Sequence, residues 1–556
     1  MFDTWEKTRG EGDFDTFAYV INTLPFPLRL VQRGGSCTAV GWACPRLFDP
    51  KRGPGRRGGR RGGVFESCGA GGRAWRWAVV LAVLAVLGSL WLRDSGQSGV
   101  SRAAWRMELL LRSLLRAEGK ASPSGPSERP KVAVGLGGCQ DVVVNGIDFL
   151  HKAGILPGTD PGYPAFIKGE RDLADSLAYY FPHGAAAERY MENKTLFQNL
   201  VQLSLEVSGT RRLLGGNAPV MANRLAHEGC QVLLGAQLSH HLRKHLHKRV
   251  SVTGDPLQDD IHLILEYPKG GKWGPYEAMR ANRFIVHNDV HNAVLSSLED
   301  FHSRLETFRP DLLVIGGLQM MDNFPFQPGE RLRRLQKLGA AMEVATRQGT
   351  LVHFELASFA DRDTLKELME AVVPRADSLG MNEQELPNLH SLLQRGEVTL
   401  VADAYPRVAT VLDEMREVFS LLNQRHRRDG MGRRLSRLHV HTLAFQAILT
   451  AQGSAWKNTM SATAKASLTA NRHVCGSVAI DCGKARLIMD DSFAVSRKPQ
   501  SRRIQLRPER PVTCWHEDAS EGKYEVCVAP VLVCTDVYQT AGGGDNISAA
   551  GLVLQI

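Results

Sequence analysis

The residues with the clearest chemical role lie near the end of the chain. Gly542, Gly543 and Gly544 lead into Asp545 and an Ala-rich segment that predicts a helix. The backbone N–H groups and the dipole at a helix N-terminus favour an anion such as a phosphate. An acid there would oppose the anion unless it had a task, and one task is to accept the proton of an attacking hydroxyl. The alternative is that Asp545 only caps a helix, and this motif alone leaves both interpretations open.

Two further motifs place acids next to predicted strands. His353 and Glu355 end an apolar run, and strand alternation puts them on one face. Asn382 and Glu385 follow the segment Ser378–Met381. Charged residues at the carboxyl ends of buried strands lie where open α/β sheets bind ligands, and carboxylates suit magnesium. The alternative for Glu385 is an acid in the first turn of an ordinary helix.

Three motifs in the first half of the chain have the chemistry to bind a polar ligand. Gly215, Gly216 and Asn217 precede an apolar helix, where glycines allow close approach and the amide both donates and accepts hydrogen bonds. Asp141 follows the first predicted strand, and Glu188 follows a run of alanines. The alternatives are a tight turn capped by Asn217 and a solvated helical acid at Glu188.

The composition is that of a globular protein of 556 residues, 43% hydrophobic and 23% charged. Much of the net charge of +10 lies in an Arg/Gly run at residues 51–61. We interpret that run as a solvated, unfolded segment rather than a phosphate-binding one. The rest of the sequence has no basic stripe interleaved with aromatics, so we expect no nucleic-acid partner.

The ten cysteines lack CxxC spacing, which argues against a structural zinc site. They leave two interpretations open: isolated buried thiols, or one or two disulfides in an oxidising compartment. Five of them cluster between Cys475 and Cys534, where a disulfide is easiest to envisage, but the sequence does not assign partners.

Alternation of strand and helix patterns predicts a parallel sheet with helices on both faces. The apolar runs typical of buried strands are Val132–Gly137, Gln231–Ala236, Asp311–Gly317 and Thr350–Ala357. Helical patterns include Gly329–Arg347 and Asp361–Val373. His262–Tyr267 and Asn282–Val286 alternate more, and we expect them in a small mixed sheet that acts as a lid.

The sequence predicts four regions. Residues 1–72 are expected to be disordered or an extension, and 73–92 form a hydrophobic segment with basic residues before its apolar centre. That segment is typical of a secretory signal or an uncleaved anchor, with a buried core helix as the alternative. Residues 93–130 are predicted as a linker and 131–556 as the functional domain. Lid segments are expected at about 148–190 and 250–290.

Taken together, these motifs resemble those of the ADP-dependent glucokinases, specifically the animal type. The resemblance runs from about Lys131 to Gly551 and does not cover residues 1–72. It depends on the order of the segments VAVGLGGCQD, GAAAER, GGN, HLILEY, RANRFI, GLQMM, HFELAS, SLGMNEQEL, LHVHTL and GGGDNISAAGL. The resemblance implies a ribokinase-like α/β fold: a large Rossmann-like α/β domain with a smaller α/β lid domain.

The resemblance also implies roles for individual residues. Asp545 becomes the catalytic base, with phosphate held at Gly542–Gly544. Magnesium would be held by Glu355 and Glu385, with Asp545 nearby. The implied sugar contacts are Asp141, Glu188, Gly215, Gly216 and Asn217. The implied nucleotide contacts are His353, His441 and Val533.

The implied reaction is phosphorylation of D-glucose by ADP, giving AMP and glucose 6-phosphate. The expected partners are ADP, D-glucose and Mg²⁺, in a monomer that associates with a membrane through residues 77–92. The resemblance implies the endoplasmic reticulum or secretory pathway. The alternatives are a related sugar kinase with another acceptor or donor, and an inactive membrane-tethered interaction protein, although Asp545, Glu355 and Glu385 are all present.

Two departures from the family pattern stand out. The family usually has Asn where this chain has Gly137, which is expected to weaken one sugar hydrogen bond or shift specificity. The chain also stops at Ile556, soon after the helix that holds Asp545 begins, and we expect weaker packing behind that residue.

Overall fold

The computed structural model describes residues 102–121, 129–158, 161–164, 166–256, 258–430, 432–520 and 522–556. The expectations for residues 1–72 and for the hydrophobic segment 73–92 lie outside these residues. Among the helices of the described part, none has the length and apolar character needed to cross a membrane.

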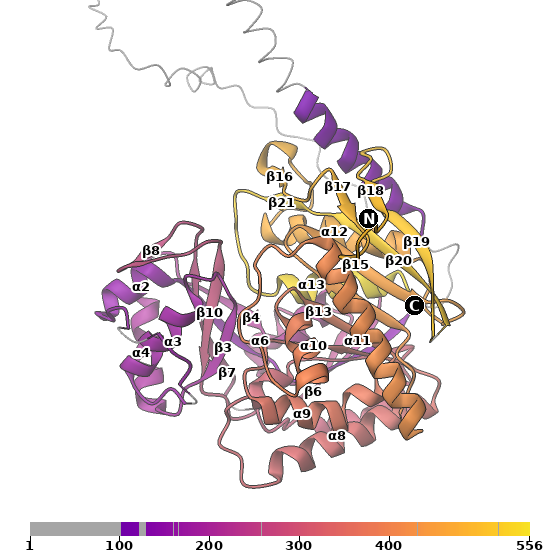
Figure 1. Ribbon diagram of the computed structural model, residues 1–556. Helices are drawn as coiled ribbons and strands as arrows, with labels where there is room; N and C mark the ends of the chain where they lie inside the picture. The colour runs from indigo at the N-terminus through magenta and orange to yellow at the C-terminus, as the bar shows by residue number, and fades with distance from the viewer. Residues whose placement is uncertain are drawn as a thin grey trace, which may run out of the picture. The chain divides into compact units, whose positions relative to one another are not determined.

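A ten-stranded sheet forms the centre of the larger part of the fold (Figure 1). Neighbouring strands from β6 to β14 pair in parallel, and the last three pairings, to β15, β20 and β19, are antiparallel. Its strand order is β19 (Thr513–Ala519), β20 (Gly522–Pro530), β15 (Phe445–Ala451), β14 (Arg437–His441), β13 (Ser378–Asn382), β12 (Leu351–Glu355), β11 (Leu312–Ile315), β1 (Lys131–Gly135), β5 (Gln231–Gln237) and β6 (Val250–Gly254).

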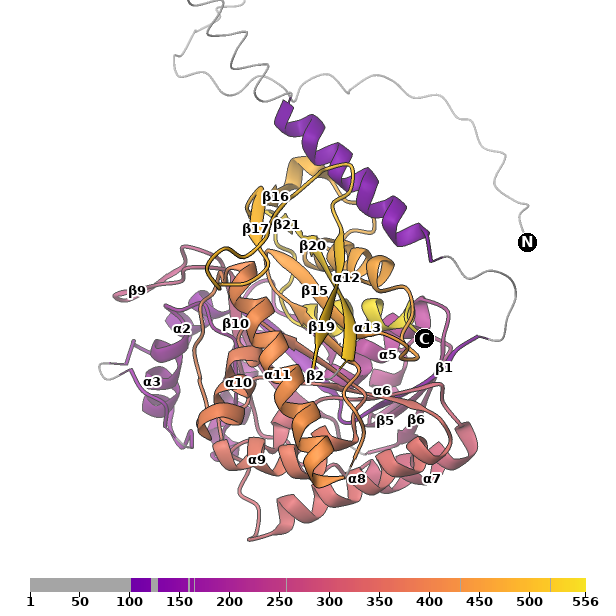
Figure 2. The same ribbon diagram turned by 45° about the vertical axis from the view of Figure 1, so that its right-hand side comes forward.

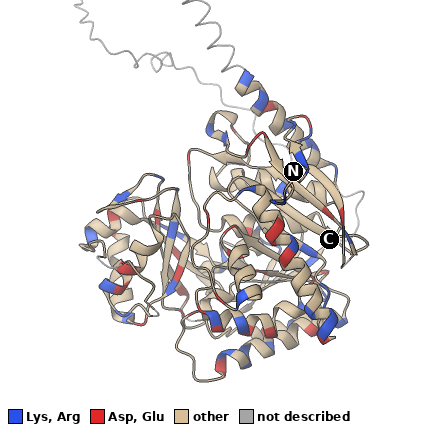
Figure 3. Ribbon diagram, in the orientation of Figure 1, with Lys and Arg blue, Asp and Glu red and all other residues tan. Residues whose placement is uncertain are grey.

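Helices cover both faces of this sheet, because strands buried on both sides need apolar cover on both. One face packs against α7 (Leu298–Phe308), α8 (Glu330–Arg347), α9 (Arg362–Ala371), α10 (Glu385–Arg395) and α11 (Val408–Asp429). The other face packs against α5 (Asn217–His227), α6 (His240–Arg243), α12 (Thr459–Val474) and α13 (Gly543–Val553). Acidic and basic residues are interspersed along α8 and α11 (Figure 3).

A separate five-stranded sheet, which we call the lid sheet, has its own apolar core. Its order is β3 (Ala187–Tyr190), β10 (Asn282–His287), β7 (Asp260–Tyr267), β2 (Cys139–Asn145) and β4 (Arg211–Gly215). The helices in that core are α2 (Gly146–Ala153), α3 (Glu170–Tyr180) and α4 (Lys194–Leu205). The prediction that His262–Tyr267 and Asn282–Val286 lie in a small mixed sheet is confirmed, and there β7 and β10 pair antiparallel.

The remaining elements are short. They are the strand pairs β8 (Lys272–Trp273) with β9 (Tyr276–Glu277), β16 (Ala485–Leu487) with β21 (Leu532–Cys534), and β17 (Ser492–Ala494) with β18 (Arg503–Gln505). Three 3₁₀ turns complete the set: η1 (Leu318–Met321), η2 (Val373–Arg375) and η3 (Cys482–Lys484).

The lid boundaries differ from those predicted from the sequence. The lid sheet takes elements from 139–215 and 260–287, whereas the prediction was about 148–190 and 250–290. The chain passes directly from β1 into β2, which pairs in parallel with β7 from Cys139 opposite Asp260 onward. The predicted lid residues 250–254 instead form β6, which pairs with β5 in the large sheet.

The predicted linker 93–130 contains a helix over residues 102–119. One side of this helix buries Leu110, Leu111 and Leu114 against α12 and β20 (Figure 2). Glu118 also pairs with Lys465 and Arg472 at 3.3 and 3.0 Å.

The helix that holds Asp545 is well packed although the chain ends soon after it. Residues 545–552 of α13 are all buried, so the weaker packing expected behind Asp545 is not seen.

We predict that Leu114→Ala destabilises the protein, because Leu114 is fully buried and Leu115 beside it is 41% exposed. Deleting buried methyl groups and leaving a cavity costs about 2–5 kcal/mol. Urea unfolding should show that loss for Leu114→Ala, and less than about 1 kcal/mol for the control Leu115→Ala. Equal losses in the two variants would show that the helix does not pack as described.

Candidate active site

A cavity of about 930 Å³ lies between the lid sheet and the large sheet, lined by residues from both. It is lined by most of the residues that the sequence singled out: Asp141, Glu188, Gly216, Asn217, Glu355, Glu385, His441, Val533, Gly542, Gly543, Gly544 and Asp545. Gly215 and His353 do not line it. The structure therefore gathers around one cavity motifs that are far apart in the chain, from Asp141 to Asp545.

Asp545 lies in the first turn of α13, just after the three glycines. Gly542 has a φ of 69°, a left-handed conformation that suits glycine, and it lets the chain turn into the helix. Asn217 Nδ2 donates a hydrogen bond of 2.8 Å to Asp545 Oδ1. Burial raises the pKa of Asp545 to about 6, and Glu355 adds to the effect. A carboxyl group with such a pKa can accept a proton near neutral pH.

Glu355 is the most heavily bonded acid of the site. It accepts from His353 Nε2 at 2.8 Å, from Ser548 Oγ at 2.8 Å and from His441 Nε2 at 3.2 Å. Burial opposes its charge, but the hydrogen bonds from His353 and His441 outweigh burial and hold the pKa of Glu355 well below its usual range. Glu355 is therefore a fixed anion.

His353 acts on this anion rather than on the cavity. It is fully buried, and its Nδ1 lies 2.8 Å from Ser378 Oγ while Nε2 faces Glu355. The sequence placed His353 among the nucleotide contacts, but the structure places it behind Glu355. His441, on β14 two strands away from β12, does line the cavity.

Glu385 begins α10, where its two oxygens accept from Asn382 N at 2.9 Å and Asn382 Nδ2 at 2.7 Å. The Asn382 side chain in turn accepts from Glu385 N at 2.9 Å, so the motif also caps the helix, as the alternative interpretation held. Burial raises the pKa of Glu385 to about 8, with Glu355 and Glu383 contributing. Glu385 therefore keeps its proton near neutral pH unless a cation compensates the charge of the carboxylate.

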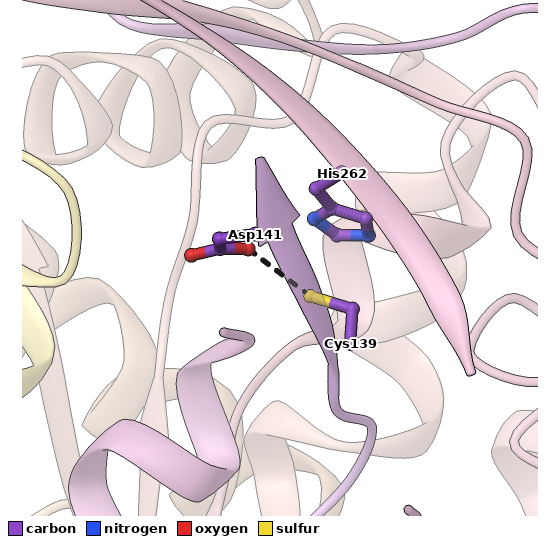
Figure 4. Close-up of side chains that lie close together, drawn as sticks. All are labelled: Cys139, Asp141 and His262. Atoms are coloured by element: carbon purple, nitrogen blue, oxygen red, sulfur yellow. Dashed lines mark hydrogen bonds between the residues drawn. The ribbon is translucent and has the colours of Figure 1, made fainter. Parts of the chain in front are cut away.

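The lid end of the cavity contains Asp141 beside Cys139 and His262 (Figure 4). The Cys139 thiol donates to Asp141 Oδ1 at 3.3 Å. Burial raises the pKa of Asp141 to about 6. A Cβ on Gly215 would come within 1.9 Å of that carboxylate, so Gly215 leaves room for Asp141 rather than contacting a ligand.

His262 was missed by the sequence argument, which treated its segment only as a strand. Its Nδ1 lies 3.2 Å from Glu188 Oε1 and its Nε2 lies 3.0 Å from Asp289 Oδ2. Burial opposes its charge, but Asp289 and Glu188 outweigh it and raise the pKa of His262 to about 10. His262 is thus a buried cation that fixes Glu188 at the cavity wall.

Gln319 and Arg283 were missed as well. Gln319 Nε2 donates to Asn217 Oδ1 at 2.6 Å and to Glu188 Oε2 at 3.1 Å. Gln319 therefore connects Glu188 of the lid to Asn217, which contacts Asp545. Arg283 lines the cavity, and its Nε has no hydrogen-bond partner within the described residues. Strand alternation was the available signal, because β10 presents Arg283 and Ile285 to the cavity while β7 presents His262, Ile264 and Glu266.

Gly137 has a φ of 96°, and a Cβ there would lie 3.0 Å from Asn292 Oδ1. Asn292 Oδ1 also accepts a hydrogen bond of 2.9 Å from Gly138 N. At the position where the family usually has Asn, the neighbouring space is therefore filled by Asn292.

The late cysteines form two disulfides, Cys475–Cys534 and Cys514–Cys527. Cys534 and its neighbour Val533 line the cavity on β21. The sequence left open whether these cysteines are isolated thiols or form disulfides, and four of the five late cysteines form disulfides. Cys482, Cys139 and Cys230 are free thiols.

Comparisons with known proteins agree with this geometry. Residues 130–554 match the family model described as the ADP-specific phosphofructokinase/glucokinase conserved region. The chain is 32% identical over 497 residues to the ADP-dependent glucokinase of Bos taurus, covering 86% of this chain and 98% of that protein. It is 30% identical over 398 residues to a probable ADP-dependent glucokinase of Caenorhabditis elegans, covering 69% and 76% of the two chains.

Solved structures show the same fold at low identity. An ADP-dependent kinase in complex with fructose 6-phosphate and ADPβS has a TM-score of 0.56 and 15% identity, over 81% of this chain and 97% of that one. An ADP-dependent phosphofructokinase from Pyrococcus horikoshii has a TM-score of 0.51 and 18% identity, over 77% and 98%. The predicted α/β fold with a large sheet and a smaller lid is confirmed.

Proposed function

Because the chain belongs to the ADP-specific phosphofructokinase and glucokinase family, we propose that it transfers the terminal phosphoryl group of ADP to the 6-hydroxyl of D-glucose. The products are AMP and glucose 6-phosphate. One observation supports this above all: a single cavity joins a buried carboxyl group at a glycine-rich helix start to a polar lid wall. The animal relatives of similar length are named as ADP-dependent glucokinases.

In the proposed reaction, glucose lies between the lid and the large sheet. Asp141 and Glu188 accept hydrogen bonds from sugar hydroxyls, and Asn217 offers both a donor and an acceptor. Asp545 accepts the proton of the 6-hydroxyl as its oxygen attacks phosphorus. The transferred phosphoryl group is stabilised by N–H groups of the Gly542–Gly544 turn.

The nucleotide occupies the part of the cavity walled by His441 and Val533. Arg283 lines the cavity from the lid, and its guanidinium supplies a positive charge for the oxygens of the moving phosphoryl group. The proposal takes a monomer as the active unit.

Magnesium is part of this proposal. Glu355 and Glu385 offer buried carboxyl oxygens to the same cavity as Asp545, and a divalent cation would compensate the charge that Glu385 gains on losing its proton. Because Glu355 already accepts three hydrogen bonds, we expect it and Glu385 to hold the cation through water. When bound, the ion neutralises charge on the phosphates.

The direct test offers glucose with ADP or ATP to the purified protein and measures AMP, ADP and glucose 6-phosphate. We expect AMP formation that depends on both ADP and glucose. Equal or faster turnover with ATP would overturn the donor assignment, and faster turnover on fructose 6-phosphate would overturn the acceptor.

We predict that Asp545→Asn lowers kcat by at least about 10²–10⁴-fold, the usual contribution of a general base. The amide oxygen can still accept from Asn217, so the local structure should persist. Glucose affinity measured by calorimetry should change by about 1 kcal/mol at most, because other residues contact the sugar. Near-normal turnover in the folded variant would mean that Asp545 only caps α13.

We predict that Glu385→Gln or Glu355→Gln raises the magnesium concentration needed for half-maximal rate, because each removes an anionic oxygen from the proposed cation site. Glu397→Gln is the matched control, since the Glu397 side chain is 72% exposed. A magnesium titration unchanged in both site variants would show that these acids are structural.

The proposal also places the enzyme at the endoplasmic reticulum, because residues 77–92 have a basic flank and an apolar centre. Residues 73–118 fused to a reporter should direct it to that membrane system. The control replaces three central leucines of the segment with lysine. A reporter that stays cytosolic with the native segment would refute the localisation.

A further inference from the structure

The carboxylate of Glu266, on lid strand β7, reaches the loop that leads into the glycine turn. It accepts hydrogen bonds from Thr540 N and Thr540 Oγ1, each at 2.8 Å, and from Ala541 N at 3.4 Å. Thr540 and Ala541 directly precede Gly542, where the left-handed turn begins. One lid side chain therefore fixes the two residues that directly precede the proposed phosphate site in the chain.

Arg211, on lid strand β4, reinforces this contact. Its Nη2 lies 3.2 Å from Glu266 Oε2, and the guanidinium lies 4.8 Å from the ring centroid of Tyr538 in the same loop. The Glu266 side chain is 18% exposed, so its hydrogen bonds are partly shielded from water. Hydrogen bonds that involve a charged group and are shielded in this way are stronger than neutral ones.

Other contacts between the lid and the large sheet do not involve this loop. Arg280 Nη1 lies 2.5 Å from Glu383 Oε1, and Gln319 contacts Glu188. These contacts can hold the lid near the large sheet without Glu266. The role of Glu266 is thereby separable from lid closure itself.

We propose that Glu266 is a positioning residue that couples lid closure to the ordering of the Gly542–Gly544 turn. When the lid moves away, the N–H groups of Thr540 and Ala541 lose their common acceptor and the loop loses its anchor. When sugar closes the lid, the carboxylate returns and fixes the loop in the geometry that binds phosphate. This inference rests on the proposed function. It adds a physical reason why glucose binding precedes the ordering of the phosphate site.

The coupling has a thermodynamic signature. If glucose orders the phosphate site through Glu266, glucose must tighten nucleotide binding, and nucleotide must tighten glucose binding by the same factor. Glu266→Ala should bring that factor close to one, while the affinity for glucose alone changes less than about 3-fold. We expect kcat to fall about 10- to 100-fold, the loss expected for removing a charge-assisted contact.

Conservative changes refine the test. In Glu266→Gln, the amide oxygen can still accept from Thr540 N, so most of the coupling should return. Thr540→Val removes only the hydroxyl bond and should lower kcat about 3- to 10-fold. The control Glu277→Ala removes an exposed lid acid that pairs only with Lys272 across β8 and β9, and it should behave as the unmodified protein.

The experiment measures binding of ADPβS, an ADP analogue that keeps both phosphates, by calorimetry with and without glucose, together with kcat and KM for ADP, on the full chain and each variant. Coupling retained in Glu266→Ala, or lost equally in Glu277→Ala, would overturn the inference. If Glu266→Ala fails to fold, a coupling factor and a kcat that are both unchanged in Thr540→Val overturn it instead. The calorimetry needs no turnover, so intact coupling in a chain without activity would refute the reaction and leave this inference standing.

Discussion

The buried carboxylate of Glu355 is the interaction on which the site depends. It joins three elements that are distant in sequence, because its partners lie on β12, β14 and α13. Gly380 on β13 makes this possible, since a Cβ there would meet Glu355 Oε2 at 2.1 Å. An anion this deep is tolerable only when its donors are fixed. The packing that satisfies Glu355 therefore also fixes where α13 starts and where Asp545 points.

The lid sheet forms one wall of the cavity because the chain crosses into it close to the large sheet. After β1 the chain leaves the large sheet at once and enters β2, so Asp141 faces the cavity only a few residues from the central strand. The chain returns through Gly215–Gly216, directly before α5 and Asn217. These are two of four crossings between the sheets, and both are short; the others are β6 to β7 and β10 to α7. A lid attached in this way can move as a unit while its proposed sugar contacts remain next to Asp545.

The sequence predicted the strands β1, β5, β11 and β12 and the helices α8 and α9, because these are long or strongly periodic apolar segments. It also placed His353 and Glu355 at the carboxyl end of a buried strand, and Glu355 lines the cavity there. It did not predict the lid boundaries, because β2 is recognisable only through its pairing with β7, and β4 only through its pairing with β2. It missed the helix at 102–119, whose partner Lys465 lies 347 residues from Glu118.

The site residues that the sequence missed share a physical reason. His262, Arg283 and Gln319 belong to no short motif, and each gains its role from a partner brought close by folding. Gly215 and His353 were assigned to ligands although they serve other protein groups: Gly215 leaves space for Asp141, and His353 fixes Glu355. A sequence motif indicates where the site lies more reliably than it indicates the role of each residue in the motif. Burial and hydrogen-bond partners assign those tasks, because a polar group enclosed by protein must find its partner there.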